Sequence, residues 1–364
     1  MKNVLIVANS GMSNSGVPNV ICQVIESIHS KCNIHLVVFN DDDFYYPFLH
    51  KKNVNIIRLN FKIPRSSFKK VSWHFVEYPR TLEREISKII KDKKIDIVHS
   101  FKEEEGWPIL KAAKKQGLSL RIAHSSTEFR KRKGFMQQVL AKRNQRKLLK
   151  YSSCNIGVCE RCCTTLFKKK PSLVLYTTYD EERYNQKVGC KLNEELVLTQ
   201  VATFSNRKNQ LFSINILESL LKLGQQCKLN LVGFPIEESY FEEMKQVISV
   251  KELGNYISII DGKQATLGVY ENTSFVLLPS IAEGAPLTIV EAQACGISCF
   301  VSDTVTKEIN CGGVTFLSLD EGSELWAKVI ENKFANNKNK RNVYDMNKFS
   351  MKTFSNSIQK IYNL

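Results

Sequence analysis

Short runs of branched and aromatic apolar residues alternate with helical stretches along the whole chain of 364 residues. Runs of this kind are typical of strands buried on both faces, and strands separated by helices predict parallel sheets covered by helices. The runs form two series of six, at 4–9, 34–40, 54–60, 95–100, 120–125 and 154–159, and then at 196–204, 228–234, 256–261, 275–280, 298–303 and 314–319. We therefore predict an α/β protein with two Rossmann-like domains.

Two polar stretches mark the expected domain boundaries. The segment 177–195, TTYDEERYNQKVGCKLNEE, separates the two series, and 332–342, NKFANNKNKRN, precedes the last helical segment. A chain of this length exceeds one ordinary core and suits two domains. We predict a first domain at 1–178, a second at 190–340, and a last helix within 341–364 that packs back on the first domain.

The N-terminus predicts a buried strand rather than a targeting segment. Its apolar run, VLIVA, is only five residues long, and no small-residue cleavage site follows it. No stretch approaches the roughly 18 continuous apolar residues that a membrane-spanning helix needs. We expect a cytoplasmic protein.

The eleven cysteines are scattered along the chain, which favours reduced thiols. Cys159 and Cys162 form a C-x-x-C pair, and in structural zinc sites such a pair is joined by a second pair or by histidines. Neither follows in this sequence, so we interpret these residues as buried free thiols and predict no metal site there.

The formal net charge of +16 comes from the first half of the chain. Residues 1–180 contain 33 lysines and arginines against 15 acidic residues, whereas residues 181–364 contain 19 against 21. An excess of positive charge in one part of a chain indicates an anionic partner, although an ordinary solvated basic surface would have the same excess of lysine and arginine.

The basic excess is concentrated at 62–70 and 129–150. On a helix through the second segment, four apolar side chains share one side among lysines and arginines: Phe135, Met136, Val139 and Leu140. This pattern is typical of a segment drawn to an anionic membrane surface, and a solvent-exposed basic helix fits it comparably well. No base-reading motif is present, so we do not expect a nucleic-acid partner.

The segment 280–296, SIAEGAPLTIVEAQACG, places Glu283 and Glu291 eight positions apart. A strand before it and a helix from Pro286 to Gly296 put Glu283 in the loop at the carboxyl end of the strand, and Glu291 about two turns along the helix. Ligands of open α/β sheets bind at that edge, and the free N–H groups of a helix start bind phosphate. The geometry suits a phosphorylated ligand held by carboxylates at both ends. Two solvated glutamates in an ordinary loop fit the spacing equally.

The same segment, PS-x2-EG-x-P-x4-EA-x2-CG, is similar to the E-x(7)-E signature of the retaining glycosyltransferase family 4, whose members have the GT-B fold. Weaker similarities follow in the same order along most of the chain: SGVPNVICQVI, RIAHSS, LVLYTTYDEERY, LVGFP and IIDGKQATLGVYENTSFVLLPS. The stretch SDTVTKEINCGGVTFLSLDEGSELWAKVI resembles the capsule and exopolysaccharide transferases of that family. The resemblance implies two parallel sheets that face a central cleft.

The resemblance also implies roles for the second domain, which would bind the sugar nucleotide. Glu283 would accept hydrogen bonds from the donor sugar and Glu291 from the ribose. Backbone N–H groups of Leu287 and Thr288 would hold the diphosphate. Lys208, in VATFSNRKNQ, would neutralise the charge that grows there as the glycosidic bond breaks.

Three further residues follow from the same resemblance. Arg207 would share the phosphate with its neighbour, because arginine binds phosphate bidentately. Gly16, in the loop SNSGVPN, would let the backbone approach the phosphates. His124 is the histidine of the first-domain segment. We thus expect Glu283, Lys208 and His124 to be catalytic, and the others to bind the donor, with no metal or further cofactor.

The implied activity is transfer of a hexose or N-acetylhexosamine from a UDP-sugar, with retention and without a metal. The acceptor would be a glycan or a saccharide on a polyprenyl diphosphate, used in cell-surface polysaccharide synthesis. The basic first domain would then lie on the acceptor side, against the inner face of the cell membrane.

Three positions depart from the family pattern. Thr203 stands where many relatives carry an arginine, Ser126 where capsule enzymes often carry a second histidine, and Ser274 where an acidic residue is common. These departures keep a rival open, in which the chain is a catalytically silent GT-B partner of an active transferase. A metal-dependent transferase using Asp41–Asp43 is a weaker alternative, and a dehydrogenase is disfavoured because no GxGxxG follows the first strand.

Overall fold

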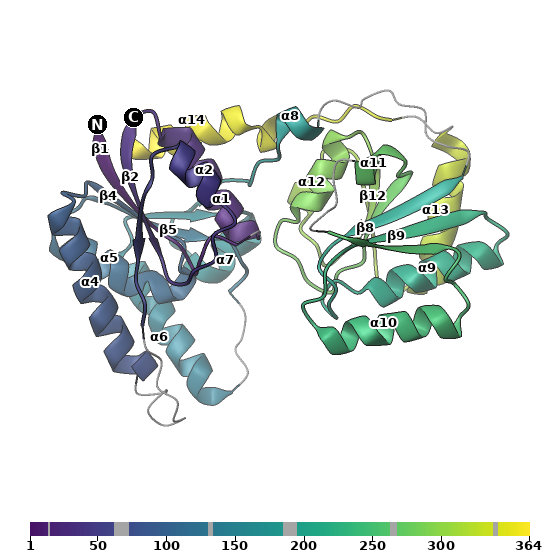
Figure 1. Cartoon of the computed structure of the whole chain (residues 1–364), viewed down its shortest axis with the longest axis horizontal. Coiled ribbons are helices and arrows are strands. Elements are labelled where there is room, and N and C mark those ends of the chain that lie inside the picture. Colours follow the sequence, from purple (N-terminus) through teal and green to yellow (C-terminus); the bar gives the residue numbers. More distant parts are fainter. Residues whose placement is uncertain (14, 62–72, 130–133, 185–194, 263–267, 338–340) are drawn as a thin grey trace. The chain divides into compact units, whose positions relative to one another are not determined.

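The computed structural model describes the chain except for residue 14 and residues 62–72, 130–133, 185–194, 263–267 and 338–340 (Figure 1). The chain divides into two compact units. The first contains Met1–Thr178 and Met351–Leu364, and the second contains Tyr179–Ser350.

The first unit is a parallel sheet of seven strands in the order β3-β2-β1-β4-β5-β6-β7. The strands are β1 (Lys2–Val7), β2 (Cys32–Val38), β3 (Asn55–Arg58), β4 (Ile97–Ser100), β5 (Leu120–Ser125), β6 (Cys154–Gly157) and β7 (Leu173–Val174). Its helices are α1 (Gly16–Ile28), α2 (Tyr46–Lys51), η1 (Trp73–Glu77), α4 (Tyr78–Asp92), η2 (Glu103–Gly106), α5 (Trp107–Lys115), α6 (Phe135–Tyr151), α7 (Glu160–Phe167) and α14 (Met351–Tyr362).

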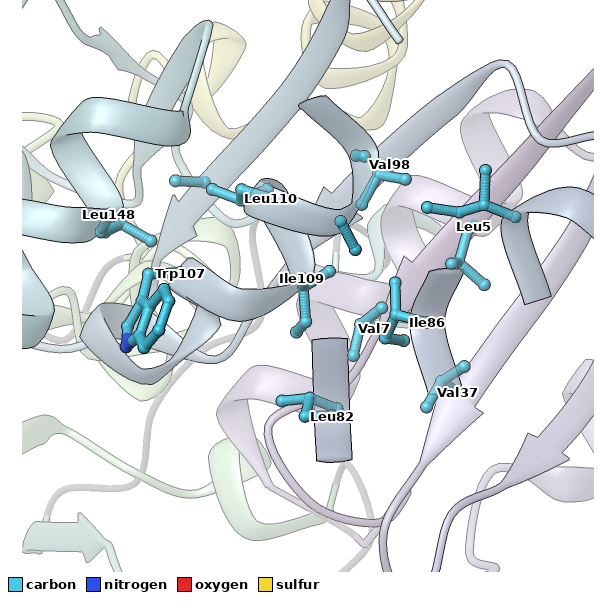
Figure 2. Close-up of a cluster of buried hydrophobic side chains, with 14 of the residues drawn as sticks. Leu5, Val7, Val37, Leu82, Ile86, Val98, Trp107, Ile109, Leu110 and Leu148 are labelled. Atoms are coloured by element: carbon cyan, nitrogen blue, oxygen red, sulfur yellow. The ribbon is translucent and has the colours of Figure 1, made fainter. Parts of the chain in front are cut away.

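One face of this sheet packs against α4, α5 and α6 (Figure 2). Apolar side chains of the four central strands meet those of the helices there, including Leu5, Val98, Ile86, Ile109 and Leu148. Burying such a side chain contributes about 1.5–3 kcal/mol. The central strands are buried along most of their length because the opposite face is covered too, by α1 and α14.

The second unit is a parallel sheet of six strands in the order β10-β9-β8-β11-β12-β13. The strands are β8 (Leu196–Val201), β9 (Cys227–Gly233), β10 (Ile257–Asp261), β11 (Phe275–Leu278), β12 (Ser298–Ser302) and β13 (Val314–Leu317). Its helices are α8 (Glu181–Tyr184), α9 (Gln210–Lys222), α10 (Glu238–Val250), α11 (Gly268–Glu271), α12 (Leu287–Ala294), η4 (Lys307–Ile309), α13 (Gly322–Asn337) and η5 (Asn347–Phe349). Its core includes Leu217 of α9, Met244 of α10 and Trp326 of α13.

The predicted fold class, two parallel α/β sheets, is confirmed, and each of the twelve apolar runs overlaps a strand. β7, with two residues, was not predicted from the sequence. Helix α14 packs on α1 in the first unit. The segment 341–350 lies with the second unit, where Tyr344 and Ser298 hydrogen-bond through their hydroxyls and Lys348 donates to the carbonyls of Glu308 and Asn310. No described helix has the length and apolar character that crossing a membrane requires.

Candidate active site

The order of strands in the second unit reverses between β8 and β11. At such a switch point the loops after the two strands turn away from each other and leave room for a ligand at their carboxyl ends. Lys208 follows β8 and Glu283 follows β11, so two residues that are 75 positions apart come from the two sides of the switch point.

Lys208 and Glu283 form an ion pair, in which the ammonium group of Lys208 donates to Oε1 of Glu283. Their side chains are 14% and 8% exposed. A pair so shielded from water interacts more strongly than a surface pair, and removing either partner leaves a largely buried charge. The structure thus brings together two of the residues that the sequence predicts to be catalytic.

Backbone and amide contacts hold the two loops in this arrangement. Asn209, in the left-handed conformation with φ 57°, donates through Nδ2 to the carbonyl of Pro279 at 3.1 Å. The backbone N–H of Ile281 donates to the carbonyl of Arg207 at 2.9 Å. Gln200 of β8 donates to the carbonyl of Lys208 at 2.7 Å. The loops therefore behave as one cross-linked platform. The Arg207 side chain is exposed, so the guanidinium is accessible to an anion.

Two hydroxyls in these loops were not identified from the sequence. Oγ of Ser205 and Oγ of Ser280 are buried and have no hydrogen-bond partner among the described residues. A buried hydroxyl without a partner is costly, and in an enzyme it commonly faces a ligand. Serine is frequent in loops, so neither position carries a signal of its own in the sequence.

Helix α12 begins at Leu287, and Thr288 is its second residue. Pro286 is the N-cap and supplies no side-chain cap, so the first N–H groups of the helix have no partner within it. Gly296, with φ 73°, ends the helix as predicted. Glu291 is the fifth residue of α12, a little over one turn along the helix. The expectation of about two turns was wrong, because even the five positions from Pro286 to Glu291 make only about 1.4 turns.

Glu291 is half-buried, and the hydroxyls of Tyr270 and Tyr184 are close enough to its carboxyl to favour the charged form. Burial raises the pKa of its carboxyl to about 7, and Arg183 with the two tyrosines opposes part of that rise. The two rings lie 6.0 Å apart and come from α8 and α11. The sequence motif identified the carboxylate but not these partners, because they lie at distant positions in the chain.

Because the pKa of Glu291 is raised, we expect the free energy of unfolding to depend on pH. A carboxyl that titrates near 7 when folded, and near the ordinary 4.5 when unfolded, binds its proton more tightly in the folded state. Its contribution to the free energy of unfolding is present below about pH 4.5 and is lost as pH rises through 7. Replacing Glu291→Gln should remove roughly 1–3 kcal/mol of this pH dependence. Urea unfolding at pH 5 and pH 8 checks it, and parallel pH curves for the two proteins would contradict it.

The carboxyl edge of the first sheet holds the other predicted residues. Gly16 is the first residue of α1, and a Cβ there would meet no atom within 4 Å. His124, near the end of β5, is buried, and burial lowers the pKa of its imidazole to about 3. It is therefore neutral at any physiological pH. The acidic triplet Asp41–Asp43 lies in an exposed loop after β2, in the same unit.

Glu103 was not identified from the sequence, although it lies at this edge. Its backbone is in the left-handed conformation with φ 45°, and its carboxylate accepts hydrogen bonds from the N–H groups of Ser126 and Thr127 at 2.7 and 3.1 Å and from Oγ of Ser125 at 2.9 Å. Burial raises its pKa to about 7, and these donors oppose the rise. The three hydrogen bonds to the Glu103 carboxylate fix the loop that follows β5, and they hold Glu103 in its strained backbone conformation.

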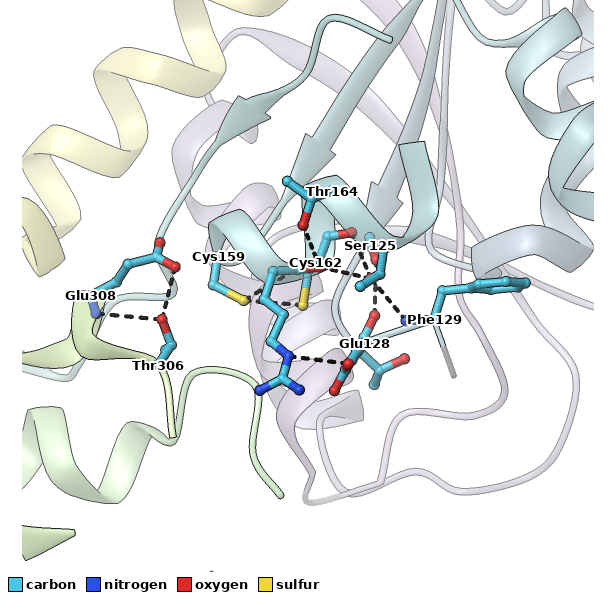
Figure 3. Close-up of polar contacts among 11 residues, drawn as sticks. Ser125, Glu128, Phe129, Cys159, Cys162, Thr164, Thr306 and Glu308 are labelled. Atoms are coloured by element: carbon cyan, nitrogen blue, oxygen red, sulfur yellow. Dashed lines mark hydrogen bonds and ion pairs between the residues drawn. The ribbon is translucent and has the colours of Figure 1, made fainter. Parts of the chain in front are cut away.

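Cys159 and Cys162 lie at the start of α7, with their Sγ atoms 3.2 Å apart (Figure 3). Neither is in a disulfide, in agreement with the sequence prediction. The hydrogen bond with Cys159 and burial raise the pKa of Cys162, so it remains protonated and unreactive. Beside them Arg161 pairs with Glu128 at 3.1 Å.

The three residues that depart from the family pattern each form a hydrogen bond in the structure. The carbonyl of Thr203 accepts a hydrogen bond from Gln210 at 3.0 Å. Ser274 is buried, and its Oγ accepts the N–H of Val197 at 3.0 Å. The N–H of Ser126 donates to Glu103, and its Oγ has no partner within the described part of the chain.

Comparison with known proteins agrees with this architecture. Residues 180–349 match the family described as glycosyl transferases group 1. A capsular polysaccharide biosynthesis glycosyltransferase, CapH of Staphylococcus aureus, is 25% identical over 278 residues, which cover 71% of this chain and 76% of that protein. EpsF of Bacillus subtilis (strain 168), provisionally named a glycosyltransferase, is 29% identical over 165 residues, so the match spans 44% of this chain and only 41% of EpsF.

Solved structures extend the similarity to the whole chain. HepE of Anabaena, crystallised with UDP and glucose, has a TM-score of 0.76 at 12% identity, with both chains covered completely. WaaG, a glycosyltransferase involved in lipopolysaccharide biosynthesis, has a TM-score of 0.64 at 14% identity, covering 98% of this chain and 99% of WaaG. At this level of identity the likeness concerns the fold. Residues 180–349, almost the whole second unit, therefore match the glycosyl transferases group 1 family, and the chain as a whole has the GT-B fold.

Proposed function

We propose that this glycosyltransferase moves a hexose or N-acetylhexosamine from a UDP-sugar to a glycan or lipid-linked saccharide during the synthesis of a cell-surface polysaccharide. The observation that carries the proposal is the shielded Lys208–Glu283 pair at the switch point of the second sheet. It supplies a cation for a phosphate and a carboxylate for sugar hydroxyls at one position.

Each residue has a distinct proposed role. Lys208 shifts from Glu283 to the diphosphate, the exposed Arg207 assists it, and the N–H groups of Leu287 and Thr288 bind phosphate oxygens. Glu283, released from the lysine, accepts hydrogen bonds from the sugar. Glu291 accepts hydrogen bonds from the ribose. A single UDP-sugar would satisfy every one of these groups.

The chemistry follows from the same groups. The bond between the anomeric carbon and the diphosphate oxygen breaks, and its electron pair goes to the diphosphate. The acceptor hydroxyl forms the new bond at that carbon, and its proton goes to the departing phosphate. Lys208 and the α12 N-terminus stabilise the negative charge as it develops. We propose retention at the anomeric carbon and no metal, in line with the family 4 resemblance.

UDP is the nucleotide that the structural relatives favour. HepE has been solved with UDP, with UDP and glucose, and with UDP-glucose. CapH, named for capsular polysaccharide biosynthesis, supports a glycan product. The test is a panel of nucleotide sugars, scored for binding and for slow hydrolysis. Binding and hydrolysis of one or more UDP-sugars is the expected result, and absence of both across the panel would overturn the proposal.

The departures at Thr203 and Ser126 favour one other candidate, a silent GT-B protein that assists an active transferase. The same panel separates the two functions. A silent partner would hydrolyse no donor when tested alone, even if it bound UDP.

We also propose that the acceptor side of the first unit lies on the cytoplasmic face of the membrane. In helix α6, Phe135, Met136 and Val139 are 81%, 51% and 40% exposed. One turn further, Lys142 and Arg146 are exposed as well. Apolar side chains next to basic ones suit an anionic lipid surface. The basic stretches 62–70 and 130–133 lie outside the described residues.

Vesicle sedimentation tests this surface. The protein should sediment with vesicles that contain anionic lipid and stay free with neutral ones. Replacing Phe135→Ser and Val139→Ser together should release it, because each buried apolar side chain contributes about 1.5–3 kcal/mol. Leu223→Ser, an exposed leucine of the second unit, is the matched control. Equal sedimentation of the double variant and the parent would contradict membrane docking, and donor hydrolysis should be unchanged in both.

A further inference from the structure

A glutamine lies where the core of the second unit would take an apolar side chain. Side chains on one face of a strand come from every second residue, so Gln200 of β8 shares its face with Leu196 and Leu198. Both leucines belong to the apolar core that β8 forms with α9. Gln200 is 1% exposed, and burying an amide is costly unless its hydrogen bonds are made. The amide of Gln200 therefore needs partners inside the unit.

The partners of Gln200 come from α9 and from the loop after β8. The hydroxyl of Ser213, in α9, donates to Oε1 of Gln200 at 2.7 Å. Nε2 of Gln200 donates to the carbonyl of Lys208 at 2.7 Å. Ser213 is 0% exposed, so the bond between the two side chains is shielded from water. We call these residues the Ser213–Gln200–Lys208 chain.

The carbonyl of Lys208 fixes the direction of this chain. A carbonyl can only accept a hydrogen bond, so the NH2 group of Gln200 must face Lys208 and its oxygen must face Ser213. The hydroxyl of Ser213 must then be the donor. A flipped amide would place two oxygens against each other at Lys208, so the chain has a single arrangement.

Lys208 depends on this contact because of where α9 begins. Asn209 is the N-cap of α9, in the left-handed conformation, and Gln210 is the first residue of the helix. Lys208 therefore lies outside the helix. Within the described part of the chain, no backbone N–H group donates to its carbonyl. Gln200 supplies the hydrogen bond to that carbonyl and so restrains the backbone from which the lysine side chain extends.

We propose that Gln200 and Ser213 are positioning residues: they fix the backbone of Lys208, and with it the point from which the ammonium group reaches the donor diphosphate. The proposal rests on the function proposed above. An amide and a hydroxyl carry no charge, so they hold the loop without attracting the ammonium group away from Glu283 or from a phosphate. A cation stabilises a transition state best when it is already in place before the charge develops.

Reductive methylation of lysines, measured by mass spectrometry, tests the positioning without requiring activity. Lys208 should react slowly in the parent, because its side chain is 14% exposed and paired with Glu283. Gln200→Met keeps the length of the side chain but removes both hydrogen bonds. Lys208 should then react about 3- to 10-fold faster, because the loop opens more often. Lys251, which pairs with Glu218 in the same unit, is the internal reference and should keep its rate.

The matched control is a buried hydrogen bond at the next position of the same strand. Thr199 is 0% exposed, and its hydroxyl lies 2.7 Å from that of Thr273. Its side chain is on the opposite face of the strand from Gln200, away from the Ser213–Gln200–Lys208 chain. Thr199→Val should therefore leave the methylation rate of Lys208 unchanged and keep turnover within about twofold of the parent.

Kinetics with a UDP-sugar test whether the chain acts through Lys208. Gln200→Met should lower turnover by about 10- to 30-fold with little change in donor KM, because the displaced cation is missed mainly in the transition state. In the Lys208→Ala background the same substitution should cost less than about twofold, because the group that it positions is gone. Ser213→Ala should lose about threefold in turnover, and Ser213→Thr, which keeps the hydroxyl, should lose less.

Three outcomes would overturn the inference: methylation of Lys208 at the parent rate in Gln200→Met, an equal loss from Gln200→Met with and without Lys208, or a loss in Thr199→Val as large as that in Gln200→Met. Failure of the proposed function looks different. In that case the parent itself would turn over no nucleotide sugar, whereas faster methylation of Lys208 in Gln200→Met would still show that Gln200 positions the lysine.

Discussion

Lys208→Ala is expected to lower donor turnover by about 10²- to 10³-fold, with a much smaller rise in donor KM. The charge that the lysine stabilises develops mainly in the transition state, so its loss appears chiefly in kcat. The structure supports this expectation, because the Lys208 ammonium group is already paired with the Glu283 carboxylate. Binding of the donor would replace that carboxylate by the diphosphate, so the donor gains little binding energy from Lys208. Steady-state kinetics with a UDP-sugar measure it.

The controls for Lys208 come from the same loop. Arg207→Ala removes an exposed charge and should cost less than about tenfold. Lys208→Ala also leaves the Glu283 carboxylate, on a side chain that is only 8% exposed, without its partner, and this should lower stability. The double variant Lys208→Met with Glu283→Gln removes both charges, so it should recover stability but not turnover. An increase in KM without a fall in kcat would show that Lys208 binds the donor but does not stabilise the transition state further.

Glu291→Ala is expected to weaken the binding of UDP itself by about 10- to 100-fold, the value of a hydrogen bond to a charged group. Glu283→Ala should leave UDP affinity within about threefold and reduce discrimination among donor sugars. The reason is their positions: Glu283 is on the loop after β11 and pairs with Lys208, whereas Glu291 is on α12 near Tyr184 and Tyr270. Calorimetry with UDP and with UDP-sugars measures both effects.

The glutamine variants refine that comparison. Glu291→Gln keeps the shape and one acceptor, so it should fall between the parent and the alanine variant. Since the Glu291 carboxyl titrates near 7, UDP affinity of the parent should also improve as pH rises through that value, beyond the change seen in Glu291→Gln. Equal loss of UDP affinity in Glu283→Ala and Glu291→Ala would contradict the proposal that Glu283 contacts the sugar and Glu291 contacts the ribose.

The fold could be predicted from the sequence because strands buried on both faces appear in it as short apolar runs. Strand β11 is apolar at every position and β1 is apolar from Val4 to Val7, and helical segments separate the strands. Glu283 and Glu291 were identifiable for a similar reason, since a strand, a loop and a helix start fix their relative positions within seventeen residues, 280–296.

The remaining features depend on contacts between distant parts of the chain. Glu291 is perturbed by Tyr184, more than 100 positions away, and His99 is bonded to Tyr362, which is 263 positions away. Neither tyrosine differs in sequence from an ordinary core residue. Glu103 is similar, because its role depends on a left-handed backbone and on the N–H groups of another loop, and one of three consecutive glutamates carries no local sign of either.

The first unit is interrupted in sequence by the second, and this affects how the protein is made. Residues 179–350 are continuous and can fold as soon as they leave the ribosome, whereas the first sheet lacks one of its covering helices until residues 351–364 arrive. Until then the apolar face that receives Phe354, Ile358 and Tyr362 stays open to water and to other nascent chains. Synthesis therefore passes through a stage in which the second unit has all its residues while the first sheet still lacks α14, and apolar surface exposed at such a stage favours aggregation.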